Sequence, residues 1–163
     1  MNIKLPFFGE LNSNSLKDYY ELQTQLGGNT VQLDLNFSGA KIEDHKLLIV
    51  KDYLDEVSKI INIAEKELLN DYENGEEVLE YLSYHIEEID KEELDGFLVN
   101  ADKSLSLEKQ LFSILKLRRI GFYPADENDF ATLDFTLGEK VSQYLLVVKM
   151  NDRKSVEYIT MES

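Results

Sequence analysis

A strict alternation of apolar and polar residues near the N-terminus constrains the fold more than any other feature. Residues 19–26 (YYELQTQL) and 30–37 (TVQLDLNF) alternate in this way, and Gly27, Gly28 and Asn29 separate them. Successive side chains of a strand point to opposite faces, so alternation on both sides of a glycine-rich turn predicts a β-hairpin. One face of this hairpin is apolar and the other is polar. We therefore expect an antiparallel sheet that is covered on one side only.

A helical periodicity follows the hairpin. Apolar residues recur at spacings of three and four from about residue 43 to residue 72, which predicts one long amphipathic helix. Asn74 and Gly75 are a natural helix stop. The residues that form the apolar stripe are Leu47, Val50, Leu54, Val57, Ile61, Ala64 and Leu68.

Shorter helices are predicted after this stop. The patterns indicate helices over residues 76–89 and 92–99. Either Ser104 or Ser106 is placed to cap a further helix that ends near Leu115.

The last third of the chain returns to strand patterns. Four strands are expected, ending at Pro124 and then within residues 130–137, 144–150 and 155–161, with turns at ADEND and NDRK. They predict a four-stranded antiparallel meander. Residues 3–8 are read as an edge strand, because Pro6 has no N–H to donate to a ladder.

The order of strands, helices and strands predicts an α+β fold, in which an antiparallel sheet packs against a central group of helices. A length of 163 residues is that of one domain, so residues 1–163 are expected to form a single domain. The pattern leaves open whether the hairpin and the meander form one sheet or two.

Composition excludes several classes of function. The chain contains no cysteine, which excludes disulfides and thiolate metal sites. The net charge of -15 repels nucleic acids and anionic membrane surfaces, so we expect neither as a partner. No signal-peptide pattern and no apolar segment of membrane-spanning length is present, which favours a cytoplasmic protein. Any protein partner is expected to be basic.

The most acidic part of the chain is residues 71–96, which hold eleven carboxylates and one lysine. On a helix, the glutamates of residues 76–89 gather on one face, with Tyr84 among them and Tyr81 at the border. This face is either an ordinary solvated surface or a docking surface for a basic protein, in which the tyrosines would be anchors. The residues of this candidate surface are Glu76, Glu77, Glu80, Tyr81, Tyr84, Glu87 and Glu88.

A metal or hydrolytic site at His85 and Glu88 is a third interpretation of the same helix. The two residues are three positions apart and share a helix face. A catalytic zinc ion usually needs three protein ligands, and the only other histidine, His45, belongs to a different helix, where we expect it at the surface. No metal and no cofactor is therefore predicted.

The only adjacent arginines, Arg118 and Arg119, give an alternative site. In a strand they point to opposite faces, and one of them is expected to form a cross-strand pair with an acid such as Asp134. A small-ligand or hydrolytic pocket between sheet and helices, near Arg118, Arg119, Tyr123 and Asp134, is the alternative function. No phosphate-loop, dinucleotide-binding or nucleophile-elbow motif supports an enzyme.

Four segments together carry a family resemblance: IKLPFFGEL, VQLDLNF, RRIGFYPADENDFATLDFTLGEKVSQYLLVVKM and ITMES. As a set they resemble a bacterial family catalogued only as a domain of unknown function. The resemblance implies a small cytosolic bacterial protein and carries over no activity and no catalytic residues. By analogy with small acidic α+β proteins, we expect a non-enzymatic protein-binding module, with an immunity-type inhibitor of a basic partner as its most specific form.

Overall fold

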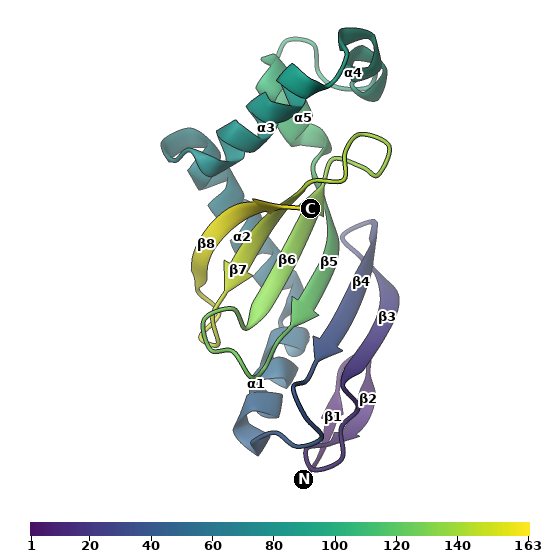
Figure 1. Ribbon diagram of the computed structural model, residues 1–163, viewed down its shortest axis with the longest axis vertical. Helices are drawn as coiled ribbons and strands as arrows, with labels where there is room; N and C mark the ends of the chain where they lie inside the picture. Colours follow the sequence, from purple (N-terminus) through teal and green to yellow (C-terminus); the bar gives the residue numbers. More distant parts are fainter.

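The computed structural model describes all residues, 1–163, and consists of a six-stranded sheet, a separate two-stranded sheet and five helices (Figure 1). This order confirms the α+β fold. The elements are β1 (Asn2–Leu5), β2 (Gly9–Asn12), β3 (Tyr19–Leu26), β4 (Asn29–Asn36), α1 (Asp44–Asp55), α2 (Val57–Asn74), α3 (Glu77–Glu88), α4 (Lys91–Phe97), α5 (Leu107–Ile114), β5 (Lys116–Phe122), β6 (Ala131–Thr136), β7 (Leu145–Met150) and β8 (Val156–Glu162).

The predicted hairpin and the predicted meander join into one sheet with the order β3-β4-β5-β6-β7-β8. Every neighbouring pair is antiparallel except β4 and β5, which run parallel with Leu33 opposite Ile120 and Leu35 opposite Phe122. A parallel pair requires a crossover connection, and the segment that contains all five helices provides it. The hairpin and the meander therefore form one sheet. They are joined only by the parallel β4–β5 pair, which we call the seam.

The turn of the β3–β4 hairpin explains its glycines. Gly27 and Gly28 have φ values of 57° and 83°, which lie in the left-handed region that glycine adopts without strain. A two-residue turn with both central residues at positive φ matches the twist of the flanking strands. Leu26 and Asn29 close the ladder, so Asn29 belongs to β4 and not, as expected, to the turn.

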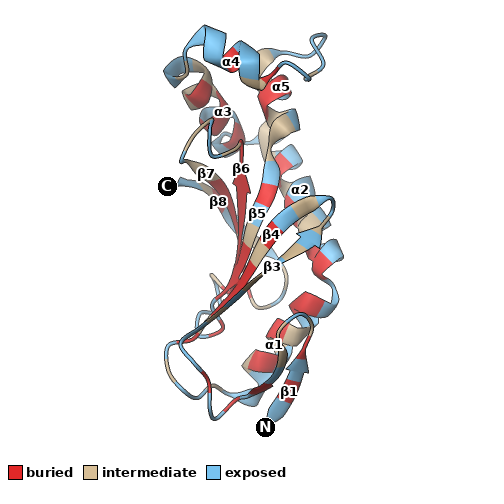
Figure 2. Cartoon of the chain, turned by 90° about the vertical axis from the view of Figure 1, so that its right-hand side faces the viewer, coloured by how far each residue is buried: buried red, intermediate tan, exposed pale blue.

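Helices α1 and α2 cover one face of the sheet, and the hydrophobic core lies between them and the strands (Figures 1 and 2). Tyr53 of α1 is fully buried against Phe122 and Phe130, with ring centroids 5.6 Å apart in both pairs. Its hydroxyl donates a hydrogen bond to the backbone oxygen of Asn151. The opposite face of the sheet carries no helix.

The predicted single helix over residues 43–72 is wrong, because the structure has two helices. Helix α1 ends at Asp55 and α2 begins at Val57, and Glu56 between them leaves helical geometry with φ -111° and ψ 29°. Leu54 and Val57 stay three positions apart across the break. The apolar periodicity therefore continues in phase across Glu56 and does not reveal the break between the two helices.

The expected edge strand over residues 3–8 is confirmed only as far as Leu5. Strand β1 ends at Leu5, and the chain turns through Phe7 and Gly9, which have positive φ values of 69° and 81°. Strands β1 and β2 pair in a sheet of their own, which contacts α1. Pro6 sits in the turn.

The remaining helices follow the predictions closely. Ser106, one of the two expected caps, accepts a hydrogen bond from the backbone N–H of Lys109 (3.3 Å) at the start of α5. Asp71 of α2 accepts one from the N–H of Val78 (2.7 Å) and so stabilises the start of α3. None of the helices combines the length and apolar character that a bilayer crossing requires.

Candidate functional site

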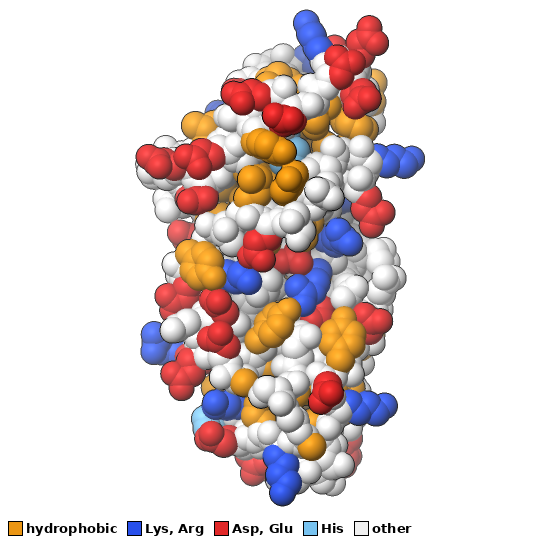
Figure 3. All heavy atoms as spheres, in the orientation of Figure 1, with side chains coloured by type: hydrophobic (Ala, Val, Ile, Leu, Met, Phe, Trp, Pro, Cys, Tyr) orange, Lys and Arg blue, Asp and Glu red, His pale blue; other side chains and the backbone are white.

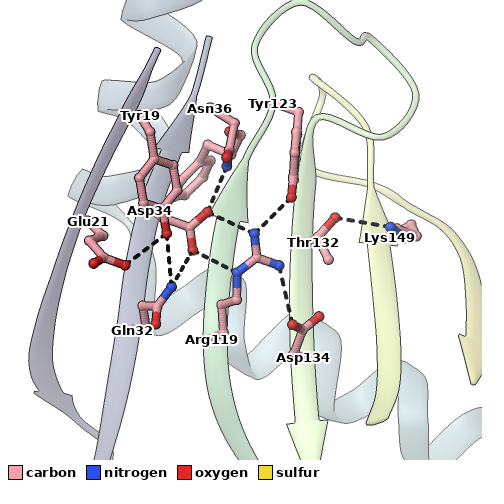
Figure 4. A network of polar contacts seen from close by, with 11 residues as sticks. Tyr19, Glu21, Gln32, Asp34, Asn36, Arg119, Tyr123, Thr132, Asp134 and Lys149 are labelled. Atoms are coloured by element: carbon pink, nitrogen blue, oxygen red, sulfur yellow. Dashed lines mark hydrogen bonds and ion pairs between the residues drawn. The ribbon is translucent and has the colours of Figure 1, made fainter. Parts of the chain in front are cut away.

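We call the side of the six-stranded sheet that points away from α1 and α2 the open sheet face. Strand side chains alternate between the two sides, so most polar strand residues collect on this face while most apolar ones enter the core. Figure 4 shows the centre of the face, with side chains contributed by β3 to β7 and by the segment just after β5. Its labelled residues are Tyr19, Glu21, Gln32, Asp34, Asn36, Arg119, Tyr123, Thr132, Asp134 and Lys149.

Arg119 is the centre of a hydrogen-bonded network on this face. Its guanidinium holds Asp34 through two parallel bonds, from Nε (2.7 Å) and from Nη2 (2.8 Å). Nη1 donates to Asp134 (3.3 Å), and Nη2 also donates to the hydroxyl of Tyr123 (2.8 Å). Such a bidentate, charge-assisted pair fixes the geometry of both partners. Asp34 and Asp134 are both buried, so the network is part of the structure and not a loose surface pair.

Gly121 makes room for this network. A Cβ atom at position 121 would lie 2.3 Å from Nη2 and 2.7 Å from Cζ of Arg119, and 3.0 Å from a carboxylate oxygen of Asp34. Gly121 lies opposite Asp34 in the β4–β5 register, so its missing side chain leaves the space through which the guanidinium crosses the seam. Any larger residue would push the arginine away from its carboxylate.

Electrostatics keep the guanidinium of Arg119 charged. Burial lowers the pKa of Arg119, but its hydrogen bonds to Asp34 and Tyr123 and the nearby carboxylates outweigh this and hold its pKa above the ordinary value. Burial raises the pKa of Asp134, and Arg119 counteracts part of that increase. Gln32 (3.2 Å) and Asn36 (2.7 Å) donate further hydrogen bonds to Asp34. Every oxygen of Asp34 therefore has at least one donor.

Three exposed tyrosines lie on the same face. Tyr19, Tyr123 and Tyr158 are 45%, 36% and 45% exposed. Figure 3, which views this side of the molecule, shows orange side chains alternating with blue Lys and Arg side chains across the middle of the sheet. The hydroxyl of Tyr19 donates to Glu21 (2.9 Å) and that of Tyr158 donates to Asp129 (3.2 Å). All three rings are therefore tethered at their polar ends.

A shallow hollow of about 520 Å³ lies beside Tyr123. Its lining is mostly polar and includes Thr132, Lys149, Asp126 and Asp129. The ammonium of Lys149 donates to the hydroxyl of Thr132 (3.3 Å) and lies 3.5 Å from Glu162, so it is already partnered.

The candidate docking surface on the acidic helix α3 is only partly exposed. Its five glutamates, Glu76, Glu77, Glu80, Glu87 and Glu88, are exposed. Tyr81 is buried, and its hydroxyl donates to the backbone oxygen of Tyr144 (2.8 Å), so its prediction as a surface anchor is wrong. Tyr84 is half-buried, with its ring 5.3 Å from that of Tyr144. Helix α3 contacts α2, α5 and β8. The buried side of this helix is therefore wider than its apolar stripe and includes Tyr81.

The candidate pair of His85 and Glu88 is not formed. His85 is buried, whereas Glu88 is exposed. Nδ1 of His85 lies 2.7 Å from the backbone oxygen of Tyr81, and Nε2 has no hydrogen-bond partner. Burial lowers the pKa of His85. No three side chains of the metal-ligating types come together anywhere in the chain, and His45 is exposed, as expected.

The alternative pocket is only partly assembled, and it lies on the other side of the sheet from where it was predicted. Arg119, Tyr123 and Asp134 come together, and the expected arginine pair with Asp134 is confirmed for Arg119. They lie on the open sheet face, because the space between sheet and helices is filled by the core. Arg118 falls at a register irregularity of β5 and points instead to Glu139, 3.8 Å away.

Sequence reasoning missed Asp34, the main partner of Arg119. Asp34 alternates in phase with Gln32 and Asn36, which assigns it to the polar face of β4. The alternation within β4 was therefore sufficient to predict on which face Asp34 lies. The parallel seam that brings β4 beside β5 has no local signal in the sequence.

Comparison with known proteins gives no match: no family model, no curated protein and no solved structure matches this chain.

Proposed function

We propose that this chain is a non-enzymatic protein-binding module and that the open sheet face contacts a basic partner. The observation that carries the proposal is the row of exposed, tethered tyrosines around Arg119 on a sheet face that no helix covers. Tyrosine and arginine are enriched among the residues that dominate binding energy at protein interfaces.

The rigidity of this face favours binding. The rings of Tyr19, Tyr123 and Tyr158 have their hydroxyls fixed to Glu21, Arg119 and Asp129. Side chains that are ordered before a complex forms lose less conformational entropy when it forms. An open, pre-ordered surface with only a shallow hollow suits a protein partner better than it suits a small molecule, which needs a deep pocket.

The charge of the face supports a basic partner. Carboxylates outnumber the cations Arg119 and Lys149 there, and the whole chain carries -15. The exposed glutamates of α3 add a long-range field that would speed association with a basic protein and make it sensitive to salt. The carboxylates on and beside the open sheet face are Glu21, Asp34, Asp129, Asp134 and Glu162. An immunity-type inhibitor, which covers a basic toxin, is the most specific form of this proposal.

A small-ligand-binding protein is the alternative function. The hollow beside Tyr123, with Lys149 and Thr132 in its lining, is the feature that favours it.

The test is affinity capture from a lysate of the source organism at low and at high salt, with mass spectrometry of the retained proteins. Three variants are compared with the parent: the double variant Tyr123→Ala/Tyr158→Ala, the α3 variant Glu80→Lys/Glu87→Lys/Glu88→Lys, and Leu48→Ala as a control for an exposed apolar side chain on α1.

The proposal expects one basic protein to bind the parent and the Leu48 control, to be lost at high salt, and to be lost with the tyrosine variant. The α3 variant should bind it more slowly but retain it. If the tyrosine variant retains the partner and the α3 variant loses it, α3 is the interface and the open sheet face is not. If no basic protein is retained by the parent, the proposal of a protein-binding module is wrong.

A further inference from the structure

The outer edge of β3 is free along its whole length. β3 is the first strand of the sheet order, and its inner edge pairs with β4 from Tyr19 to Leu26. No element other than β4 has extensive contact with it. None of the backbone hydrogen bonds outside the regular elements involves residues 19–26. The outward N–H and C=O groups, which belong to alternate residues of β3, therefore lack a protein partner.

Apart from the single charge of Glu21, this edge carries none of the usual protections. Natural edge strands are blunted by proline, lysine, bulges or a covering element. β3 contains no proline and no lysine, and its ladder with β4 is regular. The opposite edge of the sheet differs: β8 has a register irregularity beside Met150 and contacts both α2 and α3.

The charge of the chain is also lowest here. Glu21 is the only charged residue among residues 19–33, although charged residues make up 30% of the whole chain. All but one unit of the net charge of -15 therefore lies outside this segment, so little like-charge repulsion acts between two copies at this edge.

We infer that β3 pairs antiparallel with β3 of a second copy, about a two-fold axis that passes through Gln23. Two six-stranded sheets would then become one continuous sheet in a closed, symmetric dimer. This inference is independent of the proposed partner binding.

The alternation of β3 selects the register. Directly opposed residues must lie on the same face of the continuous sheet, so the axis passes through a residue and not between two. With the axis at Gln23, Tyr20 lies opposite Leu26 of the second copy and Leu22 lies opposite Thr24, all on the helix side. On the open sheet face, Glu21 lies opposite Gln25. No like charges are opposed.

An axis at Leu22 fits less well, because it would place Leu26 opposite Asp18 of the second copy. Tyr20, Leu22 and Leu26 are only half-buried in the single chain, and the Gln23 register pairs all three within the strands. Such cross-strand pairs between aromatic and aliphatic side chains stabilise a sheet.

The dimer is expected to be reversible, because one strand pair buries an area at the small end of specific interfaces. Sedimentation equilibrium at physiological salt, from about 1 µM to 1 mM protein, should show the mass rise from 18.9 kDa towards twice that value.

Two lysine variants form a matched pair that tests the register. Gln23→Lys would oppose two lysines across the axis, whereas Gln25→Lys would place each lysine opposite Glu21 of the other copy. Both change the net charge equally, on the same face of the same strand, at exposed positions. We expect dimerisation to weaken at least tenfold in the first variant and to tighten several-fold in the second.

The absence of cysteine allows an independent measurement. Under mild oxidation, Gln23→Cys should give a disulfide-linked dimer and Gln25→Cys should not, because only residue 23 meets its own copy. A parent that stays at 18.9 kDa throughout the range overturns the inference. Lysine variants with equal or reversed effects, or equal cross-linking of both cysteine variants, overturn it as well.

Discussion

Replacing Arg119 with methionine is the sharpest test of the network on the open sheet face. The change keeps an unbranched apolar stem and removes every guanidinium contact to Asp34, Asp134 and Tyr123. Asp34 is fully buried and would keep only its bonds from Gln32 and Asn36.

The magnitude follows from burial. Removing one partner of a buried ion pair destabilises a protein by about 3–5 kcal/mol, because the other charge is left uncompensated. The Arg119 side chain is 23% exposed, so we expect the lower end, about 3 kcal/mol. Arg118→Met is the matched control. Arg118 is 50% exposed and 3.8 Å from Glu139, and an exposed pair of that kind contributes at most about 1 kcal/mol.

Urea unfolding at pH 7 measures both variants, with the free energy taken from the midpoint and the slope. Repeating it at lower pH gives a second criterion. Arg119 counteracts the increase in the pKa of Asp134 that burial causes, so its removal raises that pKa further. A folded-state pKa above the unfolded value makes stability rise as pH falls. The difference between Arg119→Met and the parent should therefore narrow on acidification.

Equal losses for Arg119→Met and Arg118→Met at pH 7 would refute the reasoning, because the buried network would then contribute no more than an exposed pair. A difference that does not change with pH would show that the loss comes from packing and not from uncompensated charge.

Three other changes have expected outcomes. Gly121→Ala should displace the Arg119 guanidinium and reproduce a large part of the Arg119→Met loss in urea unfolding, and a neutral effect would contradict the close approach. Burial lowers the pKa of His85, so on acidification the unfolded chain takes up this proton at a higher pH than the folded chain does. The free energy of unfolding should therefore fall as the pH decreases through about 6.5, by at most about 1.4 kcal/mol per pH unit. Between pH 8 and 5.5, the melting temperature of His85→Phe should depend less on pH than that of the parent. An unchanged pH dependence would mean that other groups cause it. Tyr53→Phe removes one of the two donors to the backbone oxygen of Asn151, which keeps the N–H of Lys154 (3.2 Å), and should cost about 1 kcal/mol. No loss at all would mean that water replaces the hydroxyl.

Local pattern was sufficient for most of the fold. The β3–β4 hairpin and the β5–β8 meander join neighbours in sequence, so alternation and turn residues specify them. The pair of Arg119 with Asp134 was predictable for the same reason, since both lie within the meander.

The parts that could not be predicted depend on long-range packing. The pair of Arg119 with Asp34 requires the parallel seam between residues 85 positions apart, which no local pattern encodes. The burial of Tyr81 depends on which elements pack around α3, and a helical wheel places it only at a border. The break at Glu56 left the apolar stripe in phase.

The β4–β5 seam has a consequence for how the protein folds. The hairpin and the meander each consist of local contacts and can form early, but the seam must wait for the long helical crossover to bring its ends together. The seam is therefore expected to be the slow, late step. Asp34 is on one side of it and Arg119 on the other. Only a molecule that has finished folding presents the assembled network, so nascent or half-unfolded chains would not compete for whatever the face binds.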